Sequence, residues 1–314
     1  MKKNLNIFLI ACFTCLLVFS CKQDSSSNSA KSSLFGASDK LAQLEGAYDK
    51  APSVATANTL LKEILSSLGE QKFDKETQKK YMEYGLKVAN QQNIITRKAG
   101  FLMALVKDDY SNAETSNRIF ELSEIMKKMN KTTVSNTLSK GLLNTFPNFD
   151  KADKAKALLT EDMPNLDEYI AALGKSIFEN PDNTGINRNA SLAYVDACEA
   201  FALVNPTSEN SPGYLFKAAE VAKSLRTFPK SLTLYDWVID KYPNYEKAGT
   251  AMFLKGFIIE NNLGDDVKAK EVYEAFLKKY PHHDLADDVQ FLIENLGKTD
   301  EEILKMIEGK QKGK

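Results

Sequence analysis

Two ten-residue stretches near the C-terminus repeat one another 38 residues apart. The first, LYDWVIDKYP, spans residues 234–243, and the second, VYEAFLKKYP, spans residues 272–281. Tyr235 corresponds to Tyr273, and each stretch ends in a Tyr-Pro pair. Self-similarity at this period is typical of solenoids built from helix hairpins, because a single hairpin cannot bury its apolar face without a stacked neighbour. The sequence therefore predicts an all-α fold, a helix-hairpin solenoid whose repeats are clearest in the C-terminal part.

Each copy has a small residue in its first helix, a small residue in its second helix, an aromatic residue after it and a final proline. These positions are occupied by Ala219, Ser231, Tyr235 and Pro243 in the first copy and by Gly256, Ala269, Tyr273 and Pro281 in the second. In this pattern the sequence resembles the tetratricopeptide repeat family over residues 187–296, including a weaker copy that ends at Pro206. Two features depart from the family: Ser231 replaces the usual alanine, and the second copy has one extra residue in the turn between its helices.

The resemblance also implies a partner-binding face. In the family, the first helix of each hairpin lines a groove that holds a protein or peptide, with aromatic side chains for burial and charged ones for orientation. On this register the face comprises Phe216, Glu220, Lys223, Phe253, Phe257, Glu260 and Asn261. Alternatively, Phe253 and Phe257 belong to the core between repeats.

The first twenty residues are typical of a secretion signal. Lys2 and Lys3 precede an apolar run over residues 7–19, which is too short for an ordinary membrane span, and Ser20 and Cys21 follow it. The segment LVFSC resembles a bacterial lipoprotein lipobox and implies that Cys21 becomes the lipidated N-terminus, anchored by acyl chains such as palmitate. The alternative is an ordinary cleaved signal with a free Cys21.

Lys22 after the cysteine favours anchoring in the outer membrane, facing the periplasm. The segment Lys22-Gln23-Asp24 partly resembles the export tag of surface lipoproteins of the Bacteroidota, so display on the cell surface stays open. Residues 21–38 are rich in serine and poor in apolar residues, and they predict a flexible tether.

Between residues 39 and 186 the chain predicts a helical array, either of diverged repeats or of a distinct helical domain. Apolar residues recur at helical spacing, while prolines and glycines fall between the runs. The expected helices cover residues 54–68, 74–90, 93–107, 112–129, 131–145, 151–160 and 165–179. Residues 284–296 predict a capping helix, and residues 297–314 predict a short last helix and a tail.

Motifs for chemistry are scarce. The formal net charge is −1 with no basic tract, which gives no reason to expect a nucleic-acid partner. His282 and His283 are adjacent and are expected in a solvated loop, because adjacent residues converge poorly on one metal. Cys198, within an apolar run, is expected to be a small buried hydrophobe. The sequence thus predicts no catalytic residue, no metal and no cofactor.

These features together predict a membrane-anchored scaffold or adaptor that is not an enzyme. Its expected partners are other envelope proteins or peptides, bound through the repeat face, and the membrane, bound through the lipid. The function would be envelope assembly or maintenance. The alternative is a surface-exposed lipoprotein that captures an external ligand or host protein.

Overall fold

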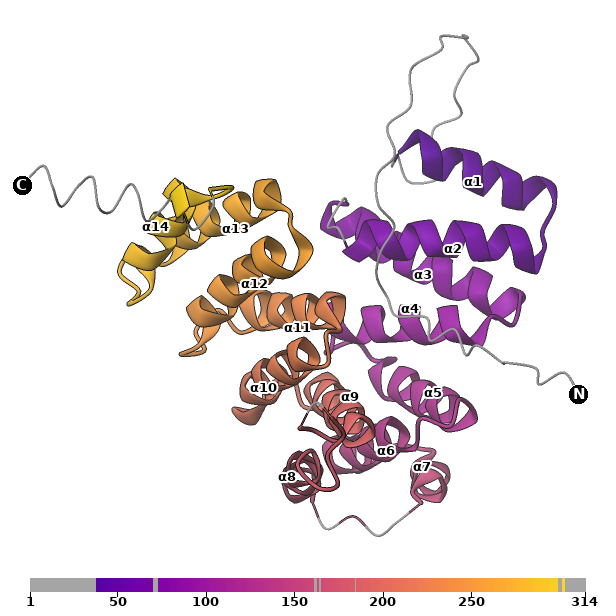
Figure 1. Ribbon diagram of the computed structural model, residues 1–314. Helices are drawn as coiled ribbons and strands as arrows, with labels where there is room; N and C mark the ends of the chain where they lie inside the picture. Colours follow the sequence, from indigo (N-terminus) through magenta and orange to yellow (C-terminus); the bar gives the residue numbers. More distant parts are fainter. Residues whose placement is uncertain are drawn as a thin grey trace, which may run out of the picture. The chain divides into compact units, whose positions relative to one another are not determined.

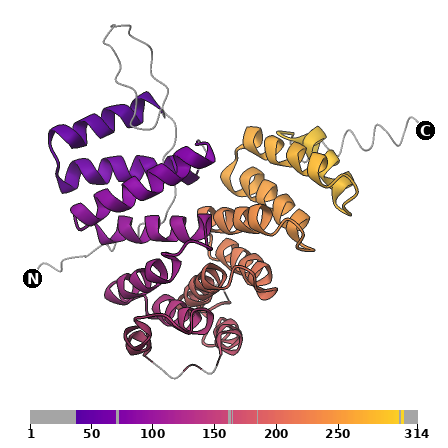
Figure 2. The ribbon, with the colours of Figure 1, turned by 180° about the vertical axis from the view of Figure 1, so that it is seen from behind.

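The protein is all-α. A computed structural model describes residues 38–69, 73–160, 163, 165–183, 185–298 and 301–302, which form fourteen helices and no strand. Figure 1 shows the helices in chain order, and Figure 2 shows the same ribbon from behind. Cys21, the predicted signal peptide and the tail after residue 302 lie outside the described residues.

The helices divide into two compact units. The N-terminal unit contains residues 38–179 and 196–208, and the C-terminal unit contains residues 180–195 and 209–302, each within the described ranges. The helices are α1 (Asp39–Lys50), α2 (Val54–Gly69), α3 (Lys75–Gln91), α4 (Ile95–Asp108), α5 (Thr115–Lys128), α6 (Thr132–Thr145), α7 (Ala152–Leu158), α8 (Leu166–Ser176), α9 (Arg188–Val204), α10 (Asn210–Ser224), α11 (Phe228–Lys241), α12 (Ala248–Leu263), α13 (Asp266–Lys279) and α14 (Ala286–Asn295). Consecutive helices contact one another from α1 to α7 and from α10 to α14, as expected of stacked hairpins.

One hairpin plan recurs in both units at the point where the two helices cross. In α3–α4, a Cβ at Gly85 would lie 2.2 Å from the ring of Phe101, 16 residues later. In α5–α6, the hydroxyls of Ser123 and Ser139, also 16 residues apart, lie 2.5 Å from one another. In α12–α13, a Cβ at Gly256 would lie 2.5 Å from the ring of Tyr273. A small residue in the first helix thus lets the second helix approach closely, and Gly256 is such a packing position.

The turns inside these hairpins share a left-handed residue. It has a positive φ, and the next residue donates its N–H back into the last turn of the first helix, which satisfies a free carbonyl. The left-handed residues are Asn93 (φ 53°), Asn130 (φ 58°), Arg226 (φ 57°) and Gly264 (φ 66°). The returning bonds are Ile94 N to Ala89 O, Lys131 N to Met126 O, Thr227 N to Ala222 O and Asp265 N to Ile259 O.

The linkers between hairpins repeat as well. Each linker contains three successive backbone hydrogen bonds. In the linker after α11, the N–H of Tyr242 donates to the carbonyl of Val238, that of Tyr245 donates to Tyr242, and that of Ala248 donates to Tyr245. The three donating N–H groups belong to residues 109, 112 and 115, to residues 146, 149 and 152, to residues 242, 245 and 248, and to residues 280, 283 and 286. The sequences FPNFDKA, YPNYEKA and YPHHDLA occupy the last three linkers. The first two hydrogen bonds of this pattern also follow α9, where the N–H groups of Asn205 and Ser208 donate them.

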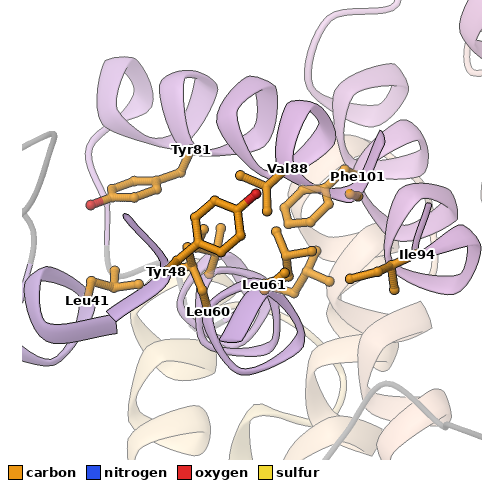
Figure 3. Packing of buried hydrophobic residues seen from close by; sticks show 12 residues of the cluster. Leu41, Tyr48, Leu60, Leu61, Tyr81, Val88, Ile94 and Phe101 are labelled. Carbon is orange, nitrogen blue, oxygen red and sulfur yellow. The ribbon is translucent and has the colours of Figure 1, made fainter. Parts of the chain in front are cut away.

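The helices expected before residue 186 are present, with ends shifted by a few residues. Asp74 accepts from the backbone N–H of Thr77 at 2.9 Å, and Ser53 accepts from that of Thr56 at 3.2 Å, so both side chains cap the helices that follow them. Helix α1 had no expected range. Its side chains and those of α2 to α4 form the core cluster in Figure 3, where Leu41, Leu61, Tyr81 and Phe101 are fully buried.

The serines at two helix crossings explain the departure from alanine. Ser231 Oγ donates to the carbonyl of Ala219 at 2.8 Å, and in α5–α6 Ser135 Oγ donates to the carbonyl of Ser123 at 2.9 Å. Both pairs are 12 residues apart and buried. A serine therefore fits the small position because its hydroxyl finds an acceptor on the partner helix.

Candidate protein-binding face on α10 and α12

The predicted binding residues lie on the first helices of two consecutive hairpins in the C-terminal unit. Phe216, Glu220 and Lys223 belong to α10, and the other four belong to α12. Because α11 contacts both helices, the two hairpins stack on one another. The individual residues differ in how much of their surface a partner can reach.

Phe216 is not exposed. Only 4% of its surface is accessible, and its ring packs edge-on against Tyr235 and Tyr245 at centroid distances of 5.7 and 6.5 Å, with Lys247 over its face. The expectation of an exposed aromatic at this position was therefore wrong. The physical reason is that Phe216 joins its own hairpin to the linker that follows.

The N-terminal unit contains the same arrangement, which supports this structural role. Phe120, three residues before the crossing residue of α5, packs on Phe149 of the following linker at 5.6 Å. Lys151 lies 5.9 Å from both rings, just as Lys247 lies over Phe216. The pattern of two rings and a lysine is thus a repeated connection between hairpins.

Lys223 and Phe257 come together across the two hairpins. The ammonium of Lys223 lies 5.3 Å from the centroid of the Phe257 ring, within range of a cation–π interaction. No ion pair of Lys223 is present among the described residues. The half-buried lysine and the half-buried ring therefore form one continuous surface of α10 and α12.

Phe253 and Phe257 have different environments. Phe253 packs against the core of α12, α13 and α14, with its ring 6.5 Å from that of Tyr273. Phe257 is half-buried, contacts Phe253 at 6.0 Å and is not part of that core. The alternative of a core residue thus holds for Phe253, whereas Phe257 keeps accessible surface.

Glu260 also has a structural partner. Its carboxylate accepts a hydrogen bond from the Tyr273 hydroxyl at 2.7 Å, across the crossing of α12 and α13. Burial, followed by this bond to a carboxylate, raises the pKa of Tyr273. Glu260 therefore stabilises its hairpin, and its replacement would disturb more than a surface.

Glu220 and Asn261 are the exposed members of the predicted set. Asn261 donates from its side chain to the carbonyl of Phe257 at 3.2 Å, along its own helix. Sequence reasoning missed two other residues on these faces, exposed Lys217 on α10 and half-buried Leu254 on α12. Leu254 precedes Phe257 by three residues and Lys217 precedes Glu220 by three, so helical spacing could have identified them.

The expected solvated loop at His282 and His283 holds only for His282. The ring of His283 fills the space above Gly249, where a Cβ would lie 2.5 Å from its Cδ2 atom, and it packs edge-on against Phe276 at 5.4 Å. Its Nδ1 accepts the backbone N–H of Leu285 at 3.1 Å. His283 takes the linker position that Tyr245 occupies one hairpin earlier, and it joins α13 to α14.

Two further findings concern chemistry and membranes. Among the residues that the structure describes, no group of three or more histidine, cysteine, aspartate or glutamate side chains could hold a metal ion. None of the described helices combines the length and the apolar character that a membrane span requires. Cys198 is fully buried, as expected, and forms no disulfide with a described residue.

The comparisons with known proteins identify the repeat. The family model described as tetratricopeptide repeat matches residues 250–283, which comprise most of α12, all of α13 and the linker up to His283. A search of curated proteins found no match to the sequence. The chain thus contains a tetratricopeptide repeat within an all-α solenoid, and repeats of this family typically act as scaffolds that bind other proteins.

Proposed function

We propose that this protein is a lipid-anchored scaffold of the bacterial envelope that binds a protein partner through α10 and α12. The observation that carries the proposal is the continuous surface formed by Lys223 and Phe257 on two stacked hairpins, one of which matches the tetratricopeptide repeat. A half-buried ring offers area for burial, and the lysine and the exposed Glu220 beside it offer charges that orient a partner. The role in envelope assembly or maintenance rests on the N-terminal sequence.

The binding face is tested with side chains that serve no other purpose in the fold. Lys217 and Glu220 are exposed on α10, and neither forms an ion pair with a described residue. We expect Lys217→Glu and Glu220→Lys to leave the free energy of unfolding within about 0.5 kcal/mol of its original value. Glu260→Lys is unsuitable because Glu260 accepts from Tyr273.

The experiment is crosslinking in living cells, with quantification of the proteins recovered with each variant. Both reversals are expected to reduce the same crosslinked partner. The control is Lys278→Glu on α13, an exposed change on the second helix of the repeat, which should leave recovery unchanged. If both α10 variants fold normally and recover every partner in full, α10 and α12 do not form the binding face.

The anchor is tested at Cys21. Cleavage and lipid attachment at a lipobox both require the thiol. We therefore expect Cys21→Ser to be lost from the outer-membrane fraction and to appear as a soluble protein or as an uncleaved precursor. Detergent fractionation and the mass of the mature protein measure this. A serine variant that partitions with the outer membrane as the original does would refute the lipid anchor and leave the binding face untouched.

Surface display is the second candidate, favoured by the partial export tag at Lys22-Gln23-Asp24. Labelling of intact cells with a membrane-impermeant reagent distinguishes the two orientations. Labelling before the outer membrane is broken indicates surface display, which capture of an external ligand requires, and labelling only afterwards indicates that the protein faces the periplasm.

A further inference from the structure

A small cavity lies in the N-terminal unit, between α3, α4 and α5. It has a volume of about 170 Å³ and is lined by the end of α3, the start of α4 and the second half of α5. The lining residues are Ala89, Asn90, Asn93, Ile95, Lys98, Glu121, Glu124, Ile125 and Lys128. The volume is several times the roughly 30 Å³ that a water molecule occupies in the liquid and below the roughly 300 Å³ of a small-molecule pocket. The cavity is therefore of a size for one long side chain.

The cavity occupies a repeated position of the hairpin plan. Glu124 directly follows the crossing residue Ser123, just as Glu220 follows Ala219 and Phe257 follows Gly256. Glu124 is thus the counterpart, in the N-terminal unit, of residues on the proposed binding face of α10 and α12. The residues that line this cavity are all different from those of the α10 and α12 face.

One wall of the cavity is apolar. Ile125 and Ala89 are buried, and Ile95 has 38% of its surface exposed, which makes it one of the most accessible large hydrophobic side chains in the described part of the chain. Apolar surface in this position gains free energy when an alkyl chain covers it, by about 25 cal/mol for each Å² removed from water.

The charged wall has one carboxylate without a cation. Glu121 pairs with Lys98 across α5 and α4. Glu124 is half-buried and forms neither an ion pair nor a side-chain hydrogen bond with any described residue. A carboxylate that is partly removed from water is stabilised by a cation that approaches it. Lys128 is exposed at the rim, where water screens its charge.

Two amides complete the polar wall. The side chains of Asn90 and Asn93 are exposed, and neither makes a hydrogen bond with a described residue. Asn93 is held in place by its left-handed backbone, whose N–H donates to the Asn90 carbonyl at 3.1 Å. Amide oxygens accept hydrogen bonds, and a primary ammonium has three to donate.

We propose that this cavity is a docking subsite for a lysine side chain of a partner protein. The alkyl stem lies on Ile95 and Ile125, the ammonium donates to the carboxylate of Glu124, and its remaining N–H groups reach the Asn90 and Asn93 amide oxygens. A lysine suits the site because its stem buries well while its compact head stays at a polar rim. The subsite gives the N-terminal unit a binding role of its own.

The test uses blocked amino acids as probes, so that no partner need be known. N-acetyl-lysine methylamide carries the stem and the ammonium, and N-acetyl-norleucine methylamide carries an alkyl stem alone. Each is titrated into the full chain labelled at isoleucine methyl groups, and the signals of Ile95 and Ile125 are followed by NMR. We expect both signals to shift saturably with the lysine probe and about ten-fold more weakly with the norleucine probe, as the loss of one charge-assisted hydrogen bond implies.

Two variants make the result specific. Glu124→Gln should weaken the lysine probe about ten-fold and leave the norleucine probe unchanged, since only the charge is removed. Lys128→Gln removes a rim cation and should strengthen the lysine probe by a factor of about two. Equal affinity for the two probes, or no effect of Glu124→Gln, would show an apolar hollow and no lysine site. The absence of any saturable shift would show that the cavity binds neither probe, and the proposal would fail.

Discussion

The hairpins α10–α11 and α12–α13 follow one backbone plan but satisfy the polar groups at their crossing in different ways. In α12–α13 the buried hydroxyl of Tyr273 donates to Glu260. In α10–α11 the buried hydroxyl of the corresponding Tyr235 has no hydrogen-bond partner among the described residues. The residue at the Glu260 position is Lys223, which lies over Phe257 of the next hairpin.

The residue type at this one position thus decides what the side chain does. Glu260 binds within its own hairpin, whereas Lys223 contacts the next hairpin. The cost falls on Tyr235, because a buried hydroxyl without an acceptor loses its hydration without compensation. Burial, and then the nearby Glu220 carboxylate, raise the pKa of Tyr235. Only the second hairpin and its linker match the family model, although both share the crossing geometry.

The largest expected effect concerns the close approach at Gly256. Gly256→Leu places a side chain where the Tyr273 ring lies, so we expect the free energy of unfolding to fall by about 1–3 kcal/mol through overpacking. Gly46→Leu on α1 is the control, because a Cβ at Gly46 meets nothing within 4 Å. Urea denaturation measures both. An unchanged midpoint for Gly256→Leu would mean that α12 and α13 do not cross at this residue.

The two tyrosines should respond with opposite sign. Tyr273→Phe removes the hydrogen bond to Glu260, and we expect a loss of about 1.5 kcal/mol, since bonds to charged groups are the stronger ones. Tyr235→Phe removes a hydroxyl that has no acceptor and should be neutral or stabilising by up to about 1 kcal/mol. Equal losses in the two variants, measured by urea denaturation, would contradict the comparison.

The turns of the two hairpins provide a third test. Arg226 and Gly264 occupy the same left-handed position, where a side chain costs about 1 kcal/mol. Arg226→Gly should therefore raise the free energy of unfolding by up to about 1 kcal/mol, and Gly264→Ala should lower it by a similar amount. Thermal melting of both variants is the measurement, and a stabilised Gly264→Ala would argue against the left-handed turn.

The smallest effect is the pH dependence of a helix cap, because α13 has a titrating residue at its N-cap and α11 does not. Asp265 caps α13 by accepting from the Lys268 N–H at 3.0 Å, and this bond lowers the pKa of its carboxyl. Because the folded pKa lies below the unfolded one, the cap contributes stability above the unfolded pKa and loses it as pH falls through the folded pKa. The corresponding residue before α11 is Thr227, which does not titrate.

Asp265→Asn separates this contribution, because asparagine can cap a helix without a charge. The difference in melting temperature between neutral pH and a pH below the carboxyl range should be smaller in the variant than in the original protein. An identical difference in the two proteins would show that the Asp265 cap does not contribute to the acid sensitivity.

Much of the plan was readable from the sequence. The 38-residue period, the prolines and the small residues at 219 and 256 predicted stacked hairpins, because close helix crossings and helix ends require particular residue types. The earlier hairpins were harder to recognise. Their signals, Asn93 and Asn130 at the left-handed positions and FPNFDKA before α7, are present in the sequence. The earlier hairpins lack the final Tyr-Pro pair, so their equivalence to the C-terminal hairpins became clear only from the repeated hydrogen bonds of the linkers.

The sequence by itself determined most of the helical segments, with α1 (Asp39–Lys50) as an exception, and the two C-terminal hairpins, since helix formation depends on neighbours within a few residues. The tertiary structure alone decided which aromatic rings are buried. Phe216 and Phe257 look alike in the sequence, yet one joins a hairpin to its linker and the other faces the surface beside Lys223. The sequence likewise did not determine that Glu260 accepts a hydrogen bond from Tyr273, or that Glu124 has no side-chain partner among the described residues. Both facts depend on which side chains the fold brings together.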